Sequence, residues 1–230
     1  MKRLLLFSLI GIGCLVVYAG KLIEYPENDT NELNWQIGIN SVELNDTATL
    51  FDVSFYHHHG YWIMLNPATK LVGRATGKEY AIKSVRGLEP GKKTYVPFSG
   101  YISSQISFEP LVPADSIVDF IEPDGWKVTG IKLYDTTEGK IKTNVSGTVD
   151  SDLVSCLMFF TDEGLLPGHE YYLVPVRDGK FNYDLYTESP KIFNVIVGLN
   201  LWEGDAKIKR FGAEGKPVII NYEYEELEPY

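Results

Sequence analysis

The sequence predicts an all-β protein that folds into two β-sandwich domains in tandem after a signal peptide. Valine, isoleucine and threonine are frequent and the chain has 15 tyrosines, all residues that favour pleated, half-buried surfaces. Short alternating segments are separated by Gly, Pro and Asn turn signals about every 8–12 residues, a spacing typical of β-sandwiches. No long stretch repeats apolar side chains at the spacing of an amphipathic helix.

Residues 1–19 are predicted to be the signal peptide. Lys2 and Arg3 precede an apolar run that ends at Ala19, where a small-residue cleavage site fits. The run is too short and too interrupted by glycine to predict a membrane span. The alternative is a lipoprotein signal, in which residues 11–14 (GIGC) form an imperfect lipobox and Cys14 carries the lipid. Both alternatives predict export to the periplasm or the cell surface, with membrane contact only if Cys14 is lipidated.

Residues 20–33 (GKLIEYPENDTNEL) are polar and rich in turn formers, and we expect a flexible leader there. Residues 34–134 are predicted to form the first sandwich, because apolar and polar residues alternate in short runs between turns. The predicted strands cover residues 35–44, 47–56, 61–65, 78–85, 94–96, 102–108, 117–121 and 127–133.

Residues 135–140 are polar and are predicted to be a linker, and residues 141–226 a second, smaller sandwich followed by a tail at 227–230. Asp178-Gly179 predicts a tight hairpin turn, because both residues accept a positive φ. The predicted strands cover residues 141–149, 154–160, 170–176, 180–186, 193–199, 206–211 and 218–224.

The charge and the cysteines restrict the function classes. The net charge is −10, and removal of Lys2 and Arg3 with the signal peptide leaves −12, which disfavours nucleic acid and anionic membranes as partners. Cys156 is then the only cysteine, and its apolar setting (LVSCLMFF) predicts a buried, unreactive thiol. The chain has no Cys-x-x-Cys motif.

Three consecutive histidines, His57, His58 and His59, raise the question of a metal site. On a strand only the first and third share a face, and a structural zinc ion needs about four ligands. Gly60 indicates that the run leaves a strand and enters a turn, so we interpret it as an exposed turn and predict no metal or cofactor.

No catalytic residue is predicted either. Gly-x-Ser-x-Gly and His-Glu-x-x-His are absent from the sequence. Asp119 and Glu122 are close in sequence, but we interpret them as solvated charges at a strand edge.

Aromatic residues near loops are the candidate ligand contacts. Tyr61, Trp62, Tyr101 and Trp126 are predicted to contact a ligand, although sandwiches also place Trp and Tyr in their cores. A sugar- or peptide-binding face and ordinary packing both remain open on this evidence.

Two parts of the chain resemble known families. The segments "VELNDTATLFDVSF", "YWIMLNPATKLVG", "GKEYAIKSVRGLEPGKKTYVPFSG", "ISFEPLVPADSIVDFIE" and "WKVTGIKL" resemble the immunoglobulin-like domain of envelope proteins of Gram-negative anaerobes. The segments "VSGTVDS", "YYLVPVRDGKFNYDL", "FNVIV" and "RFGAEGKPVIINY" are similar to a small β-sandwich that precedes the thioredoxin-like domain of TlpA-type proteins. This resemblance implies an immunoglobulin-like first sandwich and a non-catalytic region, because the redox chemistry of that family belongs to its Cys-x-x-Cys domain.

Together these observations predict a non-catalytic, exported accessory module of the cell envelope that binds a protein or a glycan. The alternatives are a carbohydrate- or peptide-binding module that uses loop aromatics, and the front half of a thiol–disulfide oxidoreductase.

Overall fold

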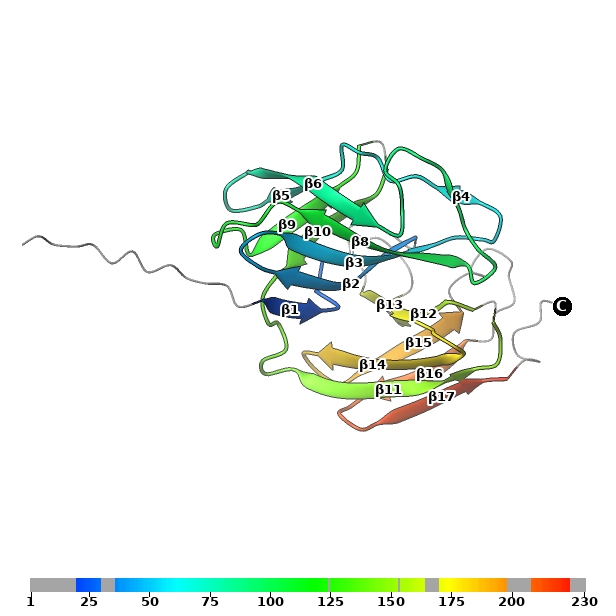
Figure 1. Ribbon diagram of the computed structural model, residues 1–230. Helices are drawn as coiled ribbons and strands as arrows, with labels where there is room; N and C mark the ends of the chain where they lie inside the picture. Colours follow the sequence, from blue (N-terminus) through cyan, green and yellow to red (C-terminus); the bar gives the residue numbers. More distant parts are fainter. Residues whose placement is uncertain are drawn as a thin grey trace, which may run out of the picture.

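A computed structural model describes residues 20–29, 36–123, 125–152, 154–163, 170–197 and 208–223 (Figure 1). The described residues form strands, turns and loops and contain no helix, which confirms the predicted all-β, sandwich-like class. No helix in these ranges is therefore long and apolar enough to cross a membrane. The predicted signal peptide, Cys14 and the tail lie outside the described residues.

The first sandwich is built from antiparallel strands that pair in the order β1-β2-β3-β8-β6-β5-β9-β10, with a separate ribbon of β4 and β7. The sheet curls, so that β9 lies over β3 and β8: the Phe120 ring is 6.5 Å from Phe51 and 6.1 Å from Phe108. These strands are β1 (Lys21–Glu24), β2 (Ile37–Leu44), β3 (Thr49–Tyr56), β4 (Trp62–Ile63), β5 (Lys70–Gly73), β6 (Glu79–Arg86), β7 (Thr94–Tyr95), β8 (Tyr101–Phe108), β9 (Ile117–Ile121) and β10 (Lys127–Lys132).

The expected flexible leader is wrong for residues 20–29. Strand β1 pairs antiparallel with β2, and beyond it the Asp29 amide donates to the Thr129 carbonyl at 2.8 Å. The first side chains of β1 are exposed, so backbone pairing holds this strand, and the side chains of Tyr25 and Glu27 hold the residues after it. Such pairing leaves no alternating pattern, which explains why the sequence did not reveal it. Residues 30–33 lie outside the described residues.

Strand β5 was also not predicted. Its four residues are too few to show an alternating pattern, yet they pair with both β6 and β9. Leu71, fully buried, is its contribution to the core.

The second sandwich packs a three-stranded sheet, β14-β11-β17, on a four-stranded sheet, β13-β12-β15-β16. The Asp178-Gly179 turn has φ values of 50° and 66°, as the hairpin prediction requires. Strands β11 and β17 run parallel and close together, because Gly147 lets the Ile220 carbonyl approach. The strands are β11 (Ile141–Val149), β12 (Cys156–Thr161), β13 (Tyr171–Pro175), β14 (Lys180–Thr187), β15 (Lys191–Val197), β16 (Lys209–Ala213) and β17 (Val218–Tyr222).

Each sandwich has its own hydrophobic core. Where the two sandwiches meet, side chains of one contact side chains of the other. Figure 1 shows the first sandwich above the second, with β1 near the junction. The guanidinium of Arg177 lies 3.9 Å from the ring centre of Tyr101 and donates to Ser54 Oγ at 3.1 Å. On the other side of the junction, the rings of Tyr25 and Tyr183 are 5.0 Å apart.

Candidate functional site

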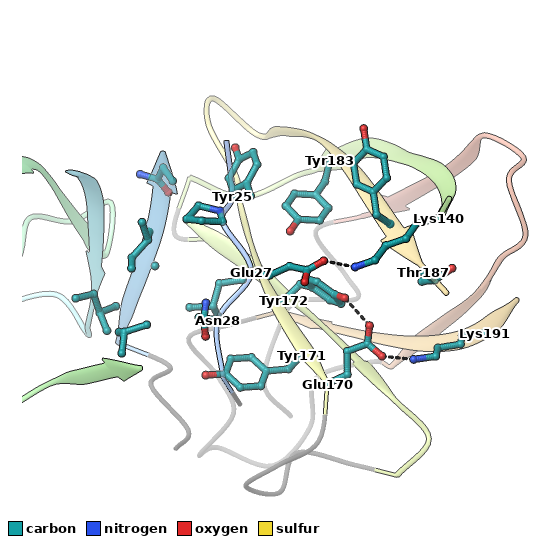
Figure 2. A pocket seen from close by; sticks show the side chains of 18 of the residues that line it. Tyr25, Glu27, Asn28, Lys140, Glu170, Tyr171, Tyr172, Tyr183, Thr187 and Lys191 are labelled. Carbon is teal, nitrogen blue, oxygen red and sulfur yellow. Dashed lines mark hydrogen bonds and ion pairs between the residues drawn. The ribbon is translucent and has the colours of Figure 1, made fainter. Parts of the chain in front are cut away.

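A cavity of about 290 Å³ lies between the two sandwiches (Figure 2). The N-terminal segment and β2 form the wall on the side of the first sandwich. Strands β13 and β14 and the residues that follow them form the other wall. The lining comprises segments 25–28, 37–40, 170–173 and 186–188, with Val128, Lys140, Tyr183 and Lys191.

Glu27 is the carboxylate that links the N-terminal segment to the rest of the cavity. It pairs with Lys140 at the end of the linker and with Lys132 of β10, the latter at 2.9 Å. Burial acts to raise the pKa of Glu27, but hydrogen bonds from the two lysines and Thr136 outweigh it, so the pKa is lowered. Glu27 therefore stays ionised and neutralised by its partners.

A second carboxylate, Glu170, stands on the opposite wall. It accepts hydrogen bonds from the Lys191 ammonium and from the Tyr172 hydroxyl (Figure 2). Burial, and next the charge of Glu170, raise the pKa of Tyr172, so its phenol keeps its proton.

A third carboxylate of the lining, the exposed Glu188, lies 3.5 Å from the Lys140 ammonium. The cavity thus places three carboxylates against Lys140 and Lys191, with Lys132 as a second partner of Glu27.

Tyrosine rings form much of the remaining wall. Tyr172 packs 6.1 Å from Tyr183, and Tyr183 in turn contacts Tyr25 across the junction. Burial, then the hydroxyl of Tyr25 and the charge of Glu27, raise the pKa of Tyr183. These neutral phenols can donate and accept hydrogen bonds, but they cannot act as bases at neutral pH.

Thr187, at the end of β14, contributes a hydroxyl of another kind. The residue is only 2% exposed, and its Oγ1 has no hydrogen-bond partner among the described residues. A buried hydroxyl without a partner is unfavourable by about 1–3 kcal/mol. Thr187 lines the cavity, but its Oγ1 is closed to a water-sized group, so a ligand in the cavity does not reach it.

A second candidate surface is the aromatic ribbon, which we define as Tyr61, Trp62, Met64, Tyr95 and Phe98. All five side chains are large and exposed, from 40% for Met64 to 66% for Tyr95. Trp62 and Tyr95 are direct partners in the β4–β7 pair, so their side chains stand on one face, while Ile63 points into the core. Two of the predicted contact residues, Tyr61 and Trp62, lie here.

Lys93 is the basic residue that contacts this ribbon. Its ammonium lies 4.0 Å from the ring centre of Trp62, a cation–π contact. Several neighbouring cations in the sequence are paired with acids instead: Lys70 with Glu79, Arg74 with Asp29 and Asp119, and Lys92 with Glu89.

The three histidines follow β3 and pack on the ribbon. The His57 ring stacks on Tyr61 at 4.5 Å, and His59 meets Phe98 edge-on at 5.3 Å. Burial, and next His58, lower the pKa of His57. Within the described ranges no group of three or more His, Cys, Asp or Glu side chains is arranged to hold a metal ion.

The other two predicted contact residues lie elsewhere. Trp126 is half-buried, packs 4.9 Å from Phe55 and lies against the core of the first sandwich. The ring of Tyr101 stacks against the guanidinium of Arg177, so Tyr101 lies at the junction of the two sandwiches. The structure therefore brings Tyr61 and Trp62 together and separates both from Tyr101 and Trp126.

The interpretation of Asp119 and Glu122 as solvated edge charges is wrong. Glu122 is 5% exposed, and it accepts the amide protons of Asn66 at 2.7 Å and Trp126 at 3.1 Å. Asp119 accepts from Arg74 at 2.8 Å and from the Gly130 amide at 2.7 Å. Turns, and the irregular pairing of β10 with β9 around Gly130, leave backbone amides without sheet partners, and these carboxylates supply the acceptors.

Cys156 is buried, as its apolar setting predicted. Burial raises the pKa of its thiol to about 12, although the charge of Arg177 acts to lower it. The thiol is therefore protonated at neutral pH and shielded from reagents.

Comparison with known proteins yields no relative: no protein-family model and no curated protein matches the chain.

Proposed function

We propose that the protein is a non-catalytic, exported binding module of the cell envelope, and that its aromatic ribbon binds an anionic glycan. The observation that carries the proposal is the exposure of five large apolar side chains on one short ribbon. Contiguous exposed apolar side chains are characteristic of interaction sites.

The pairing of Trp62 with Tyr95 suits the flat faces of sugar rings. Directly opposed side chains on an antiparallel pair stand about 4.5–5.5 Å apart at their Cβ atoms, so two rings form one platform. The C–H face of a sugar ring can pack on such a platform while its hydroxyls remain in water.

The Lys93 ammonium favours an anionic glycan over a neutral one. It lies on the Trp62 ring, where it can meet a carboxylate or sulfate of a sugar packed beside that ring. Salt screens this attraction.

The non-catalytic part of the proposal rests on the state of the titratable groups. Glu27 and Glu170 are each held by ammonium partners, and the pKa of Glu27 is lowered, whereas a general acid needs a raised pKa. The Cys156 thiol is buried. The resemblance to the non-catalytic region of TlpA-type envelope proteins supports the same role, and with it an immunoglobulin-like first sandwich and export.

Affinity electrophoresis and calorimetry with polygalacturonate and with dextran test the proposal. We expect the chain from Gly20 onward to bind polygalacturonate but not dextran, with affinity that falls as salt increases. Trp62→Ala, Tyr95→Ala and Lys93→Gln should each weaken binding about tenfold, a loss of about 1.4 kcal/mol.

Tyr134→Ala is the matched control, because Tyr134 is 39% exposed and lies outside the ribbon. Binding that Tyr134→Ala weakens as much as Trp62→Ala would contradict the proposal, as would the absence of binding to polygalacturonate. Release of reducing ends from the polysaccharide would contradict the non-catalytic role.

A further inference from the structure

We infer that the cavity between the two sandwiches is a binding site for a small neutral polyhydroxylated ligand, about the size of one sugar ring. This site is separate from the aromatic ribbon, and the inference does not depend on what the ribbon binds.

The size of the cavity limits the ligand. A volume of about 290 Å³ corresponds to the space of about ten water molecules and lies at the lower end of the range for small-molecule sites. A single ring with its substituents fills this space, and the rest of a longer ligand would extend out of the cavity into solvent.

The charges of the cavity favour a neutral ligand. Glu27 is neutralised by Lys140 and Lys132, and Glu170 by Lys191, while the exposed Glu188 lies 3.5 Å from Lys140. An anionic ligand would meet three carboxylates, and a charged ligand of either sign would compete with the partly buried pairs, which is unfavourable. A neutral ligand can use the carboxylate oxygens and ammonium protons that the pairs leave free.

The hydrogen-bonding groups suit hydroxyls. Carboxylates only accept, ammoniums only donate, and the phenols do both. A single hydroxyl of the ligand can satisfy any of these, whereas an ether oxygen can only accept. The rings of Tyr25, Tyr172 and Tyr183 supply flat apolar faces for the C–H groups of the ligand.

Calorimetry and thermal unfolding with a panel of single compounds test the inference. The panel contains glucose, galactose, mannose and arabinose as neutral sugars, with galacturonate, glutamate and lysine as charged compounds of similar size. We expect at least one neutral sugar to bind with a millimolar or lower Kd, to raise the unfolding temperature, and to bind more tightly than the charged compounds.

Tyr172→Phe is the decisive variant, because it removes a phenolic hydroxyl of the cavity lining and keeps the ring. It should weaken binding of the sugar about fivefold, the equivalent of one hydrogen bond. Tyr134→Phe removes a phenolic hydroxyl away from the cavity and should leave binding unchanged. Trp62→Ala should also leave it unchanged, which separates this site from the ribbon.

Three results would overturn the inference. The first is that no neutral sugar of the panel binds. The second is that a charged compound binds more tightly than every neutral sugar. The third is that Tyr172→Phe, folded as judged by its circular dichroism, binds as tightly as the unchanged protein.

Discussion

Replacement of Arg177 tests whether the two sandwiches are held together by the contact with Tyr101. The guanidinium stacks on that ring at 3.9 Å and donates to Ser54 Oγ at 3.1 Å, while its other nitrogen binds the Ser155 and Val176 carbonyls. The cation–π contact contributes about 1–2 kcal/mol when partly desolvated, and a hydrogen bond from a charged donor about 1.5–3 kcal/mol. Because one side chain makes both, we expect Arg177→Ala to destabilise the protein by about 2–4 kcal/mol.

Urea unfolding followed by tryptophan fluorescence and circular dichroism measures this loss. The half-buried Trp126 reports on the first sandwich, to which Tyr101 belongs. A double-mutant cycle with Tyr101→Leu isolates the ring contact, and we expect a coupling free energy of about 1 kcal/mol. Arg210→Ala is the matched control: its ion pair with Asp162 is exposed, so the change should stay within about 0.5 kcal/mol.

Additive effects of Arg177→Ala and Tyr101→Leu, within about 0.3 kcal/mol, would refute the reasoning. Tyr101 would then be available for the ligand contact that the sequence suggested. Separate unfolding transitions in Arg177→Ala, against one transition in the unchanged protein, would show directly that the residue couples the sandwiches.

Three further changes have defined outcomes. Burial acts to raise the pKa of Asp115, but hydrogen bonds from Thr76 and Tyr80 lower it overall. Its contribution to stability is therefore present above its ordinary pKa and lost on acidification, so Asp115→Asn should destabilise the protein by about 2–3 kcal/mol at pH 7 and by less at pH 3. Equal losses in thermal melts at both pH values would exclude this account. Burial raises the pKa of the Cys156 thiol, so its contribution to stability is present below the pKa of the unfolded thiol and falls as the pH rises toward about 12. At pH 8 the folded protein should not react with a disulfide reagent, whereas the urea-unfolded protein should. Rapid reaction before unfolding would contradict the burial of the thiol. A Cβ at Gly147 would lie 1.7 Å from the Ile220 carbonyl oxygen, so Gly147→Ala should separate β17 from β11 and destabilise the protein by about 3 kcal/mol or more. The control, Gly212→Ala, meets only the flexible end of Glu214 at 3.3 Å and should have a small effect. Similar melting temperatures for the two variants would count against this packing.

The strands that the sequence revealed are those with one buried face. Strand β3 alternates in sequence from Phe51 to Phe55, because it lies between β2 and β8 with one face on the core. The other face of its second half is buried as well, at the junction where Ser54 accepts from Arg177. The Asp178-Gly179 hairpin was equally readable, since the turn itself requires those residues. Strands β1 and β5 could not be predicted in this way. Backbone pairing with exposed side chains defines β1, and β5 is too short to show an alternating pattern.

The parts of the candidate sites that depend on neighbouring residues could also be predicted, and those that depend on distant residues could not. Tyr61 and Trp62 could be predicted, because consecutive aromatic residues beside a turn are readily exposed. Trp126 was misplaced, because its neighbours in sequence are polar while its contact, Phe55, comes from another strand. The cavity could not be predicted at all: its walls come from segments far apart in the chain, and only the docking of the two sandwiches brings them together.

The double attachment of Glu27 also changes how the connection between the sandwiches behaves. Its carboxylate holds Lys132, in the last strand of the first sandwich, and Lys140, the last residue before the second. The chain between these two lysines is therefore pinned at both ends by one side chain from the beginning of the protein. It behaves as a closed loop and not as a free tether, and the swivelling that a polar linker would otherwise permit is restricted. A dissection of the protein that begins at residue 34 would remove this clasp together with β1, so pieces cut there would exaggerate the independence of the two sandwiches.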